Sequence, residues 1–305
     1  GAVATETFSL TVNGPVTGTA FVGDGSGLTV DGSTVAALLA RIQELEEQVA
    51  LLPLATPGGR LWVYGFGSSG GSDLGQAIAS DANGDVLVAG YFNGTVNFGG
   101  GPLTSAGGYD IFVAKFSGVD GAHLWSKRFG DTSPDYGISI DLDESGNVLV
   151  TGGFSATVDF GGGPLTSVGV QDIFVVKFSG VAGTHVWSKR FGATSYNRGH
   201  GITADGSGTV LVTGYFAGTV NFGGGPLTSA GGVDIFVAKF SEADGTHLWS
   251  NRFGATSDDR GIGIAVDGSG NALATGLFQG TVDFGGGGRL TSAGLEDIFV
   301  LKLRR

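Results

Sequence analysis

Residues 143–154 read DESGNVLVTGGF, and residues 172–178 read DIFVVKF. The first stretch begins with Asp, Ser, Gly and Asn, which favour tight turns, and continues with Val, Leu and Thr, which favour strands. In the second stretch Ile173 and Val175 face one way and Phe174 the other, as in a strand with large side chains on both faces. The two stretches therefore predict two β-strands.

Both stretches recur along the chain at a nearly constant interval. The turn aspartates are 62 residues apart, at Asp81, Asp143, Asp205 and Asp267. The DIFV motif begins at Asp110, Asp172, Asp234 and Asp297. Of the 21 Phe residues, all except Phe8 and Phe21 lie in this array. Four copies of a 62-residue repeat are therefore predicted, and such self-similarity is the sequence signature of repeat architectures.

Each copy contains four predicted strands. In the second copy they are Leu124–Gly130, which holds a Trp, then Gly137–Asp143, Val148–Phe154 and Asp172–Phe178. A glycine-rich excursion that contains ATVDFG separates the last two strands. Repeated four-stranded units predict an all-β fold, a four-bladed β-propeller over residues 58–305. A solenoid would need atypical capping repeats at its two ends, and none is visible in the sequence.

The two ends of the repeat array are offset by one strand. The first Trp segment, Leu61–Gly67, has no DIFV strand before it, and the last DIFV strand, Asp297–Leu303, has no Trp strand after it. Pairing of these two segments would close a ring, which is the usual way in which a propeller avoids exposed edges. We therefore expect Leu61–Gly67 to complete the last blade.

The motifs of the repeat carry a resemblance to a known family. The DxxGNVLVTG motif at Asp143–Gly152, the DIFVxKF motif and the GxxxW turn resemble the SBBP-type β-propeller repeats of exported and surface bacterial proteins. The DGTHLW segment, Asp244–Trp249, also resembles the tryptophan-docking hairpins of quinoprotein-type propellers. The SBBP type is named for seven blades, whereas this sequence has four copies, so the number of blades in a closed ring stays open. The resemblance implies a fold and a surface location but no activity.

Composition excludes several classes of partner and site. The formal net charge is −12, which argues against nucleic acid and anionic membranes. No apolar run reaches the length of about 18 residues that a membrane helix needs. Because there is no Cys, a disulfide framework, a thiolate metal site and a Cys nucleophile are all excluded. The first residue is Gly rather than Met, which indicates either a processed, exported precursor or a trimmed tag, and we expect an extracellular or cell-surface location.

Residues 1–57 share nothing with the repeat. Within residues 1–32, the segment FSLTV at residues 8–12 alternates apolar and polar side chains and predicts one short strand, which a turn-rich arm follows. Residues 33–57 are predicted to form a helix and a Pro-containing linker, and the apolar residues of this helix have the spacing of a coiled coil. These heptad residues are Val35, Leu38, Ile42, Leu45, Val49 and Leu52.

The heptad predicts self-association. Val and Ile at a positions with Leu at d positions are typical of two-stranded coils. However, FVGDGSGLT at residues 21–29, followed by a short heptad, resembles the collar and neck segments of trimeric fibre and tail-spike proteins. This resemblance favours a homotrimer over a dimer. The alternative is an amphipathic helix that packs on the propeller, since a helix this short is not stable alone.

The four histidines give no sign of a catalytic or metal site. Three of them, His123, His185 and His247, hold one repeat position and are expected on surface strands of separate blades. His200 departs from the repeat, and no partner for it is evident. The sequence contains no HExxH motif and no Ser-His-Asp order. We therefore predict no catalytic residues.

Lysines recur with the aspartates that open the DIFV strands, at Lys115, Lys177, Lys239 and Lys302. A regular set of Asp and Lys in identical blades indicates structural salt bridges or turn caps. Single surface pairs contribute only about 0–1 kcal/mol to stability. We therefore expect these Asp–Lys pairs to set the register of the strands rather than to stabilise the fold.

Two sets of carboxylates could bind a cation. Asp141, Asp143 and Glu144 form a segment that faintly resembles a calcium loop, but an Asp that caps a tight turn explains this segment and its copies better. The second set precedes the predicted innermost strand and could ring one mouth of a central channel. It comprises Asp73, Asp135, Asn197 and Asp259. Converging carboxylates would need a counter-ion, for which Ca²⁺ is the candidate, and the alternative is that each side chain caps its own loop.

The uniformity of the copies argues against an enzyme, because no blade holds a unique polar cluster or a long insertion. The sequence favours a non-enzymatic extracellular binding or scaffold protein, in which an oligomerising stalk displays propeller heads to surface proteins or glycans. One alternative is a subunit of a surface fibre or filament that assembles through the N-terminal strand and helix. A quinoprotein-like or glycan-active enzyme is a further alternative.

Overall fold

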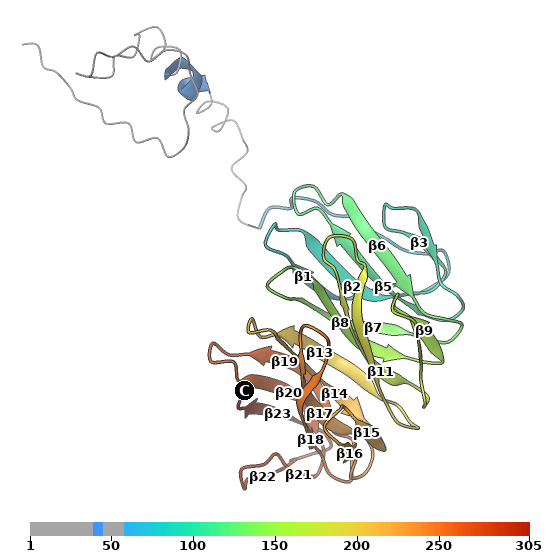
Figure 1. Cartoon of the computed structure of the whole chain (residues 1–305), viewed down its shortest axis with the longest axis vertical. Helices are drawn as coiled ribbons and strands as arrows, with labels where there is room; N and C mark the ends of the chain where they lie inside the picture. Colours follow the sequence, from blue (N-terminus) through green and yellow to red (C-terminus); the bar gives the residue numbers. More distant parts are fainter. Residues whose placement is uncertain (1–38, 45–57) are drawn as a thin grey trace, which may run out of the picture. The chain divides into compact units, whose positions relative to one another are not determined.

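A computed structural model of the chain describes residues 39–44 and 58–305 (Figure 1). The chain divides into two units, Gly1–Arg60 and Leu61–Arg305. In the first unit residues 39–44 are α-helical. Ile42 is therefore on a helix, whereas the other predicted heptad residues and the predicted N-terminal strand lie outside the described residues. No helix among the described residues is long and apolar enough to cross a membrane.

The first blade of the second unit is an antiparallel sheet of four strands. In spatial order the sheet is β1-β2-β5-β6. These strands are β1 (Leu74–Ser80), β2 (Val86–Phe92), β5 (Asp110–Phe116) and β6 (His123–Phe129). The Trp strand β6 therefore belongs to the sheet of the DIFV strand that precedes it in the sequence, and it pairs with β5.

The next two blades repeat this arrangement, with the orders β7-β8-β11-β12 and β13-β14-β17-β18. The second blade contains β7 (Tyr136–Leu142), β8 (Val148–Phe154), β11 (Asp172–Phe178) and β12 (His185–Phe191). The third contains β13 (Arg198–Ala204), β14 (Thr209–Phe216), β17 (Asp234–Ser241) and β18 (His247–Phe253). The fourth blade has three strands, β19 (Arg260–Val266), β20 (Ala272–Phe278) and β23 (Asp297–Leu303).

The glycine-rich excursion of each copy forms a small separate hairpin. The eight short strands are β3 (Thr95–Asn97), β4 (Pro102–Thr104), β9 (Thr157–Asp159), β10 (Pro164–Thr166), β15 (Thr219–Asn221), β16 (Pro226–Thr228), β21 (Thr281–Asp283) and β22 (Arg289–Thr291). The strands β1, β7, β13 and β19 adjoin in this order, so they are the innermost strands of successive blades.

The sequence predicted the strands of the repeat well. Val148–Phe154 and Asp172–Phe178 have the predicted bounds, and the other two strands of the second copy start one residue earlier than predicted. An all-β fold of repeated four-stranded sheets, as in a β-propeller, is thus confirmed.

The predicted closure of the ring is wrong in this structure. Leu61–Gly67 forms no strand, and β23 pairs with β20 alone. The four blades leave this segment apart from β23, and its side chains contact the first blade. Trp62 Nε1 donates to the Gly118 carbonyl at 3.3 Å, and Phe66 stacks on Phe116 with 5.2 Å between ring centroids. The first and last blades stand at opposite ends of the row of sheets in Figure 1.

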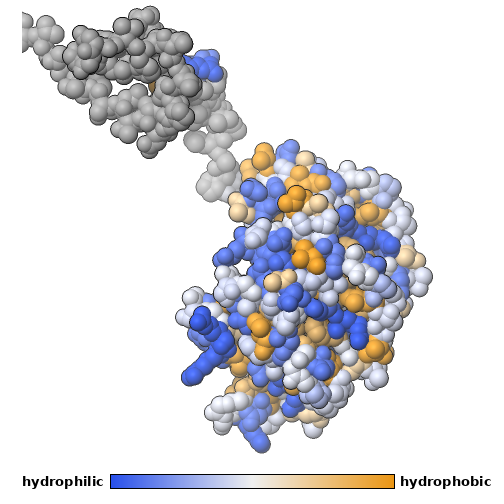
Figure 2. Space-filling view, viewed as in Figure 1, coloured by the Kyte–Doolittle hydropathy of each residue, from blue (hydrophilic) through white to orange (hydrophobic). Residues whose placement is uncertain are grey.

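The core lies between the blades. On β11, Phe174 and Val176 pack with Ile111 and Val113 of the first blade, whereas the opposite face of β11 packs against the third blade. The predicted alternation of the DIFV strand therefore places its two faces in two neighbouring interfaces. Full burial of each such side chain contributes about 2 kcal/mol. On the face shown in Figure 2, hydrophilic and hydrophobic residues are interspersed over the second unit.

Candidate functional site

Each blade has an aspartate that caps the turn between its two innermost strands. In the second blade Asp143 Oδ1 accepts the N–H groups of Ser145 and Asn147, both at 2.8 Å. Gly146 completes the turn with a φ of 76°, which lies in the left-handed region that favours glycine. The equivalent carboxylates accept the same pair of N–H groups, at Asp81, Asp205 and Asp267. The structure thus shows the turn caps that the sequence favoured.

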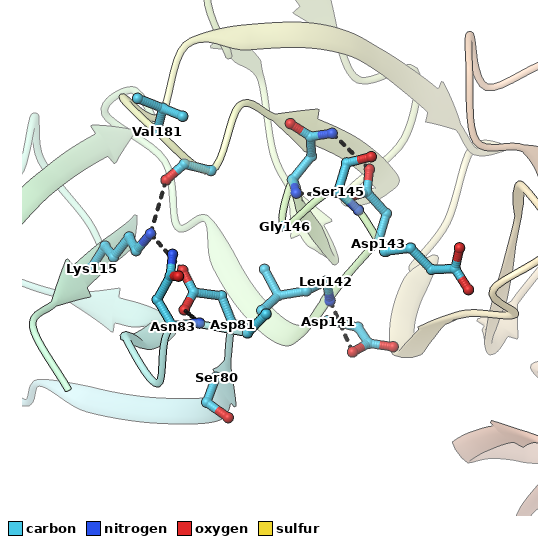
Figure 3. Close-up of a pocket in the computed structure, with 14 residues that line it drawn as sticks. Ser80, Asp81, Asn83, Lys115, Asp141, Leu142, Asp143, Ser145, Gly146 and Val181 are labelled. Atoms are coloured by element: carbon cyan, nitrogen blue, oxygen red, sulfur yellow. Dashed lines mark hydrogen bonds and ion pairs between the residues drawn. The ribbon is translucent and has the colours of Figure 1, made fainter. Parts of the chain in front are cut away.

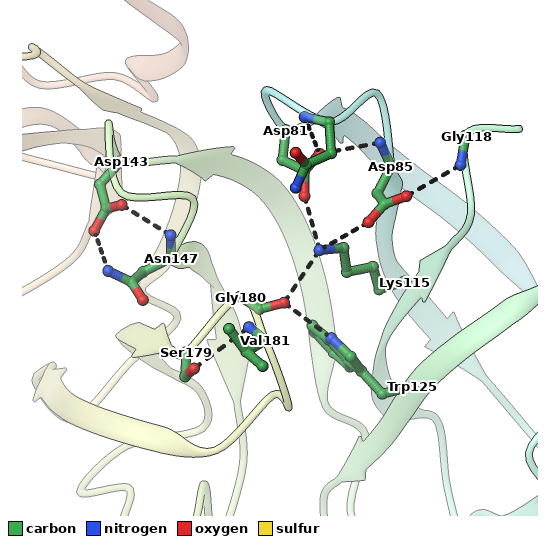
Figure 4. A network of polar contacts seen from close by, with 11 residues as sticks. Asp81, Asp85, Lys115, Gly118, Trp125, Asp143, Asn147, Ser179, Gly180 and Val181 are labelled. Atoms are coloured by element: carbon green, nitrogen blue, oxygen red, sulfur yellow. Dashed lines mark hydrogen bonds and ion pairs between the residues drawn. The ribbon is translucent and has the colours of Figure 1, made fainter. Parts of the chain in front are cut away.

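All four repeated lysines pair with these turn aspartates, and Lys115 and Lys177 also contact the neighbouring blade, as Figure 4 shows for Lys115. Lys115 Nζ lies 2.7 Å from Asp81 and 3.2 Å from Asp85, and it also donates to the carbonyl of Gly180 in the second blade. Burial acts to lower the pKa of Lys115, but the hydrogen bonds that its ammonium group donates to the two carboxylates outweigh it, and the pKa is raised. The same Gly180 oxygen accepts the indole N–H of Trp125 at 3.2 Å.

The aspartates that open the DIFV strands have other partners than these lysines. Asp110 and Lys115 lie near opposite ends of one strand, so each forms its salt bridge with a residue of another segment. Asp110 pairs with Arg128 of β6, and Asp172 pairs with Arg190 at 2.6 Å. The predicted salt bridges therefore exist, but the Lys and the Asp of one DIFV strand do not pair with each other. The Lys pairs with a turn aspartate, and the Asp pairs with an Arg.

A polar cleft of about 440 Å³ lies between the first two blades (Figure 3). Three of its four acidic side chains are engaged in structural bonds: Asp81 and Asp143 cap their turns, and Asp141 Oδ2 accepts the N–H of Ala204 in the third blade at 3.0 Å. Lys115 and the Gly180 carbonyl close one side. The cleft is consequently part of the blade-to-blade network.

The structure places the four residues of the predicted cation ring in loop caps. Asp135 accepts the N–H groups of Asp131 and Ser155, and Asn197 Oδ1 accepts the N–H of Ala217, so these side chains cap loops within their own blades. The other two members make equivalent bonds, Asp73 with Asn93 and Asp259 with Gln279. Among residues 39–44 and 58–305, no three His, Asp or Glu side chains gather in a way that could hold a metal ion.

The three repeated histidines each contact a serine on the same strand. His123 Nε2 lies 3.0 Å from Ser126 Oγ, and His185 and His247 make the same contact with Ser188 and Ser250. Burial lowers the pKa of His185 and of His247. Their positions on strands of three separate blades agree with the placement that the sequence predicted.

A row of aromatic and arginine side chains crosses all four blades where the innermost strands begin. We call it the Tyr–Arg row, and it comprises Tyr91, Tyr136, Arg198, Tyr215 and Arg260. The Tyr91 and Tyr136 rings meet edge to face at 4.9 Å. The Arg198 guanidinium lies over Tyr136 at 4.7 Å and pairs across the sheet with Tyr215, over which Arg260 lies at 5.4 Å. Each residue is half-buried, so the row presents one edge to solvent.

Neighbouring side chains hold the two arginines of this row in place. Arg198 Nε donates to Gln171 Oε1 at 2.7 Å, and Arg260 Nη2 donates to Asp258 Oδ2 at 2.9 Å. Arg260 Nε is buried and has no hydrogen-bond partner among the described residues. The row therefore combines fixed positive charge with aromatic faces.

His200 is part of the same surface. Its ring lies 5.4 Å from that of Tyr215, on the position where each innermost strand bulges. Burial, with the charges of Arg198 and Arg260, lowers the pKa of His200 to about 4. The equivalent residues in the other blades are Gln76, Ile138 and Ile262. The lone irregular histidine thus belongs to a cluster that the sequence analysis did not find.

The Tyr–Arg row escaped sequence analysis because it consists of positions at which the copies differ. The positions of Tyr136, Arg198 and Arg260 hold Leu74 in the first blade, and the position of Tyr91 and Tyr215 holds Gly153 and Leu277 in the other two. An alignment of the four copies brings out the residues that they share and not the positions at which they differ. The differences between the copies were the available signal, because three of the six Tyr and the one His that departs from the repeat lie at such variable positions near the innermost strands.

Comparisons with known proteins agree with the fold. The SBBP β-propeller repeat family model matches residues 124–152. An uncharacterized WD repeat-containing protein of Acanthamoeba polyphaga mimivirus is 24% identical over 255 residues, which cover 70% of this chain. The match spans only 18% of the length of that relative. Together with the four repeated sheets around adjoining inner strands, these similarities support a β-propeller repeat fold for the chain.

Proposed function

We propose that the chain is a non-enzymatic binding module whose ligand docks on the Tyr–Arg row. The observation that carries this proposal is the location of the differences between copies. Where the repeats agree, their polar residues are engaged in turns and blade contacts. Where they differ, Tyr136, Arg198 and Arg260 form one continuous surface at the start of the innermost strands. A binding site needs such residues, whereas the scaffold does not.

The chemistry of the row favours an acidic glycan. The solvent-exposed edges of Tyr136 and Tyr215 can pack against the apolar face of a sugar ring, and guanidinium groups bind carboxylates through charge-assisted hydrogen bonds. The protein carries a net charge of −12, so a local pair of arginines would concentrate recognition of a uronic acid at this surface.

Calorimetric titration with oligouronates tests this proposal. The double variant Arg198→Leu with Arg260→Leu introduces the residue that the first blade has at this position, Leu74, and should preserve the fold. Because each charged hydrogen bond contributes about 1.5–3 kcal/mol, we expect affinity to fall by at least about tenfold for each arginine. Lys127→Gln with Lys189→Gln removes the same charge from outer strands and should leave affinity unchanged. Equal losses in both variants would contradict the proposal.

The same titration addresses the enzymatic alternative. Oligouronates recovered after long incubation should keep their chain length and their oxidation state if the chain only binds them. Shortened or oxidised products would instead support a glycan-active or quinoprotein-like enzyme.

We further propose that residues 33–57 self-associate and display the propeller at the cell surface. The heptad spacing supports this, and Ile42 lies on a helix with 45% of its surface exposed. Replacing Ile42 and Leu45 with Asp would place charges in the apolar seam, where desolvation is costly. Light scattering should then show a loss of the trimeric mass while the melting of the blades is unchanged. A mass that grows with concentration would favour the fibre alternative.

A further inference from the structure

The last blade exposes a face that the other three blades bury. Ile111, Ile173 and Ile235 are fully buried, whereas Ile298 at the same repeat position is 81% exposed. On the same face Val300 is 83% exposed, although its counterparts in the other blades are buried. In those blades the two side chains pack against the innermost strand and the β-sheet of the following blade.

The first blade exposes the complementary surface on its opposite face. Ile78 is 70% exposed, whereas its counterpart Ile140 is 6% exposed because the first blade covers it. The first blade also has a cavity of about 130 Å³. Its lining is mostly apolar and includes Gly75, Val88, Phe92, Phe98, Phe112 and Phe116. In the second blade a Cβ on Gly137 would meet Ile111 Cγ2 at 3.0 Å, so the equivalent position, Gly75, marks where an inserted Ile side chain would end.

The segment Leu61–Gly67 already occupies the position of a preceding blade's outer strand. Phe66 contacts Phe116 at 5.2 Å, as Phe129 of β6 contacts Phe178 of the second blade at 5.0 Å. Trp62 donates to the Gly118 carbonyl, as Trp125 donates to that of Gly180. One end of the unit thus holds an outer strand without its blade, and the other holds a blade without its outer strand.

We propose that the last blade of one copy docks on the first blade of a second copy. By the register of β5 with β6, Ile298 would oppose Phe66 and Lys302 would oppose Trp62. Ile298 and Val300 would then enter the cavity of the second copy. Lys302, whose side chain is 60% exposed, would reach the Gly118 carbonyl as Lys115 reaches that of Gly180.

Two copies satisfy both faces at once. Each copy supplies one exposed last blade and one open first blade, so two identical junctions close a ring of eight blades, which is within the usual range of about 4–8. Within one copy the two faces stand at opposite ends of the row of sheets, and Trp62 holds Leu61–Gly67 on the first blade. The occupant that we propose is a blade of the same repeat from another copy, independently of any ligand of the Tyr–Arg row.

Cysteine cross-linking in the full chain tests this proposal, because the natural sequence has no Cys. Copies carrying Gly75→Cys are mixed with copies carrying Ile298→Cys under mild oxidation. We expect a disulfide-linked species of twice the 30.6 kDa chain mass. Gly137→Cys is the matched control, since its site is filled within its own chain, and it should not cross-link with Ile298→Cys.

Other outcomes overturn the proposal. A disulfide that forms only within a chain carrying both changes would show that four blades close on themselves. No cross-link in either arrangement, with the mass of one chain by light scattering, would show that copies do not dock through these faces. Neither result would alter binding at the Tyr–Arg row, which the arginine variants measure separately.

Discussion

Trp125 donates its indole N–H to the carbonyl oxygen of Gly180, 3.2 Å away, and this bond ties the outer strand of the first blade to a turn of the second (Figure 4). The equivalent bond between Trp187 and Glu242 ties the second blade to the third. Stability of the repeat thus depends on contacts between blades as well as on pairing within each sheet.

The change Trp125→Phe removes this hydrogen bond and keeps an aromatic ring. Because both partners are buried, we expect the free energy of unfolding to fall by about 1–2 kcal/mol, as urea denaturation would measure. Trp62→Phe removes an equivalent bond from a segment without a sheet partner and should have a smaller effect. A larger loss in the Trp62 variant would contradict this account of the blade contacts.

Asp135 should make stability depend on pH. Burial, with the nearby charges of Asp131 and Asp110, raises its pKa to about 7, above the ordinary value of 3.8. A raised pKa in the folded state means that the contribution of Asp135 is fully present below pH 4 and is lost as pH rises towards 7.

The variant Asp135→Asn, with the residue that the third blade has at position 197, removes this dependence. Between pH 4 and pH 8 the free energy of unfolding of the variant, measured by urea denaturation, should rise by on the order of 2 kcal/mol relative to that of the parent. Parallel stability curves for the two proteins over this range would show that Asp135 does not titrate there.

His200 should act in the opposite direction. Its pKa of about 4 lies below the ordinary value of 6.5, so its contribution is present above pH 6.5 and is lost as pH falls towards 4. His200→Ile, which copies positions 138 and 262, should lose less stability than the parent on acidification, by on the order of 2 kcal/mol. Equal acid sensitivity in thermal melts of the two proteins would disprove this role.

Calcium should not stabilise the blades through the side chains of the predicted ring. Asp73, Asp135, Asn197 and Asp259 each accept N–H groups of their own loops, and an ion that binds only the folded state would have to raise the melting midpoint. We expect no shift at millimolar calcium. A shift of the melting midpoint that disappears in a variant with Asn at positions 73, 135 and 259 would show that calcium binds at these side chains.

Sequence periodicity was sufficient to predict the strands, because alternation and turn residues are local properties. The bounds of Val148–Phe154 and Asp172–Phe178 followed directly from them. The partner of Lys115 did not, since Asp81 belongs to a turn 34 residues earlier that only the sheet order brings near. Likewise the residues of the Tyr–Arg row meet across blades, and neither spacing nor composition indicates that contact.

Closure of the ring was predicted from pairing alone. The offset of Leu61–Gly67 and Asp297–Leu303 predicts two halves of one blade, but sequence gives no angle between blades. In the structure four blades leave these halves apart, and the packing of Phe66 and Trp62 holds the first half in place.

Amide hydrogen exchange of β23 measures most directly whether the two open ends are parts of one interface. The backbone N–H groups on the free edge of Asp297–Leu303 have no partner strand within the described chain. If the last blade docks on a second copy, these groups and those of Leu61–Gly67 should be protected at high protein concentration and should exchange faster on dilution. Fast exchange at every concentration, with β20 protected throughout, would contradict the account.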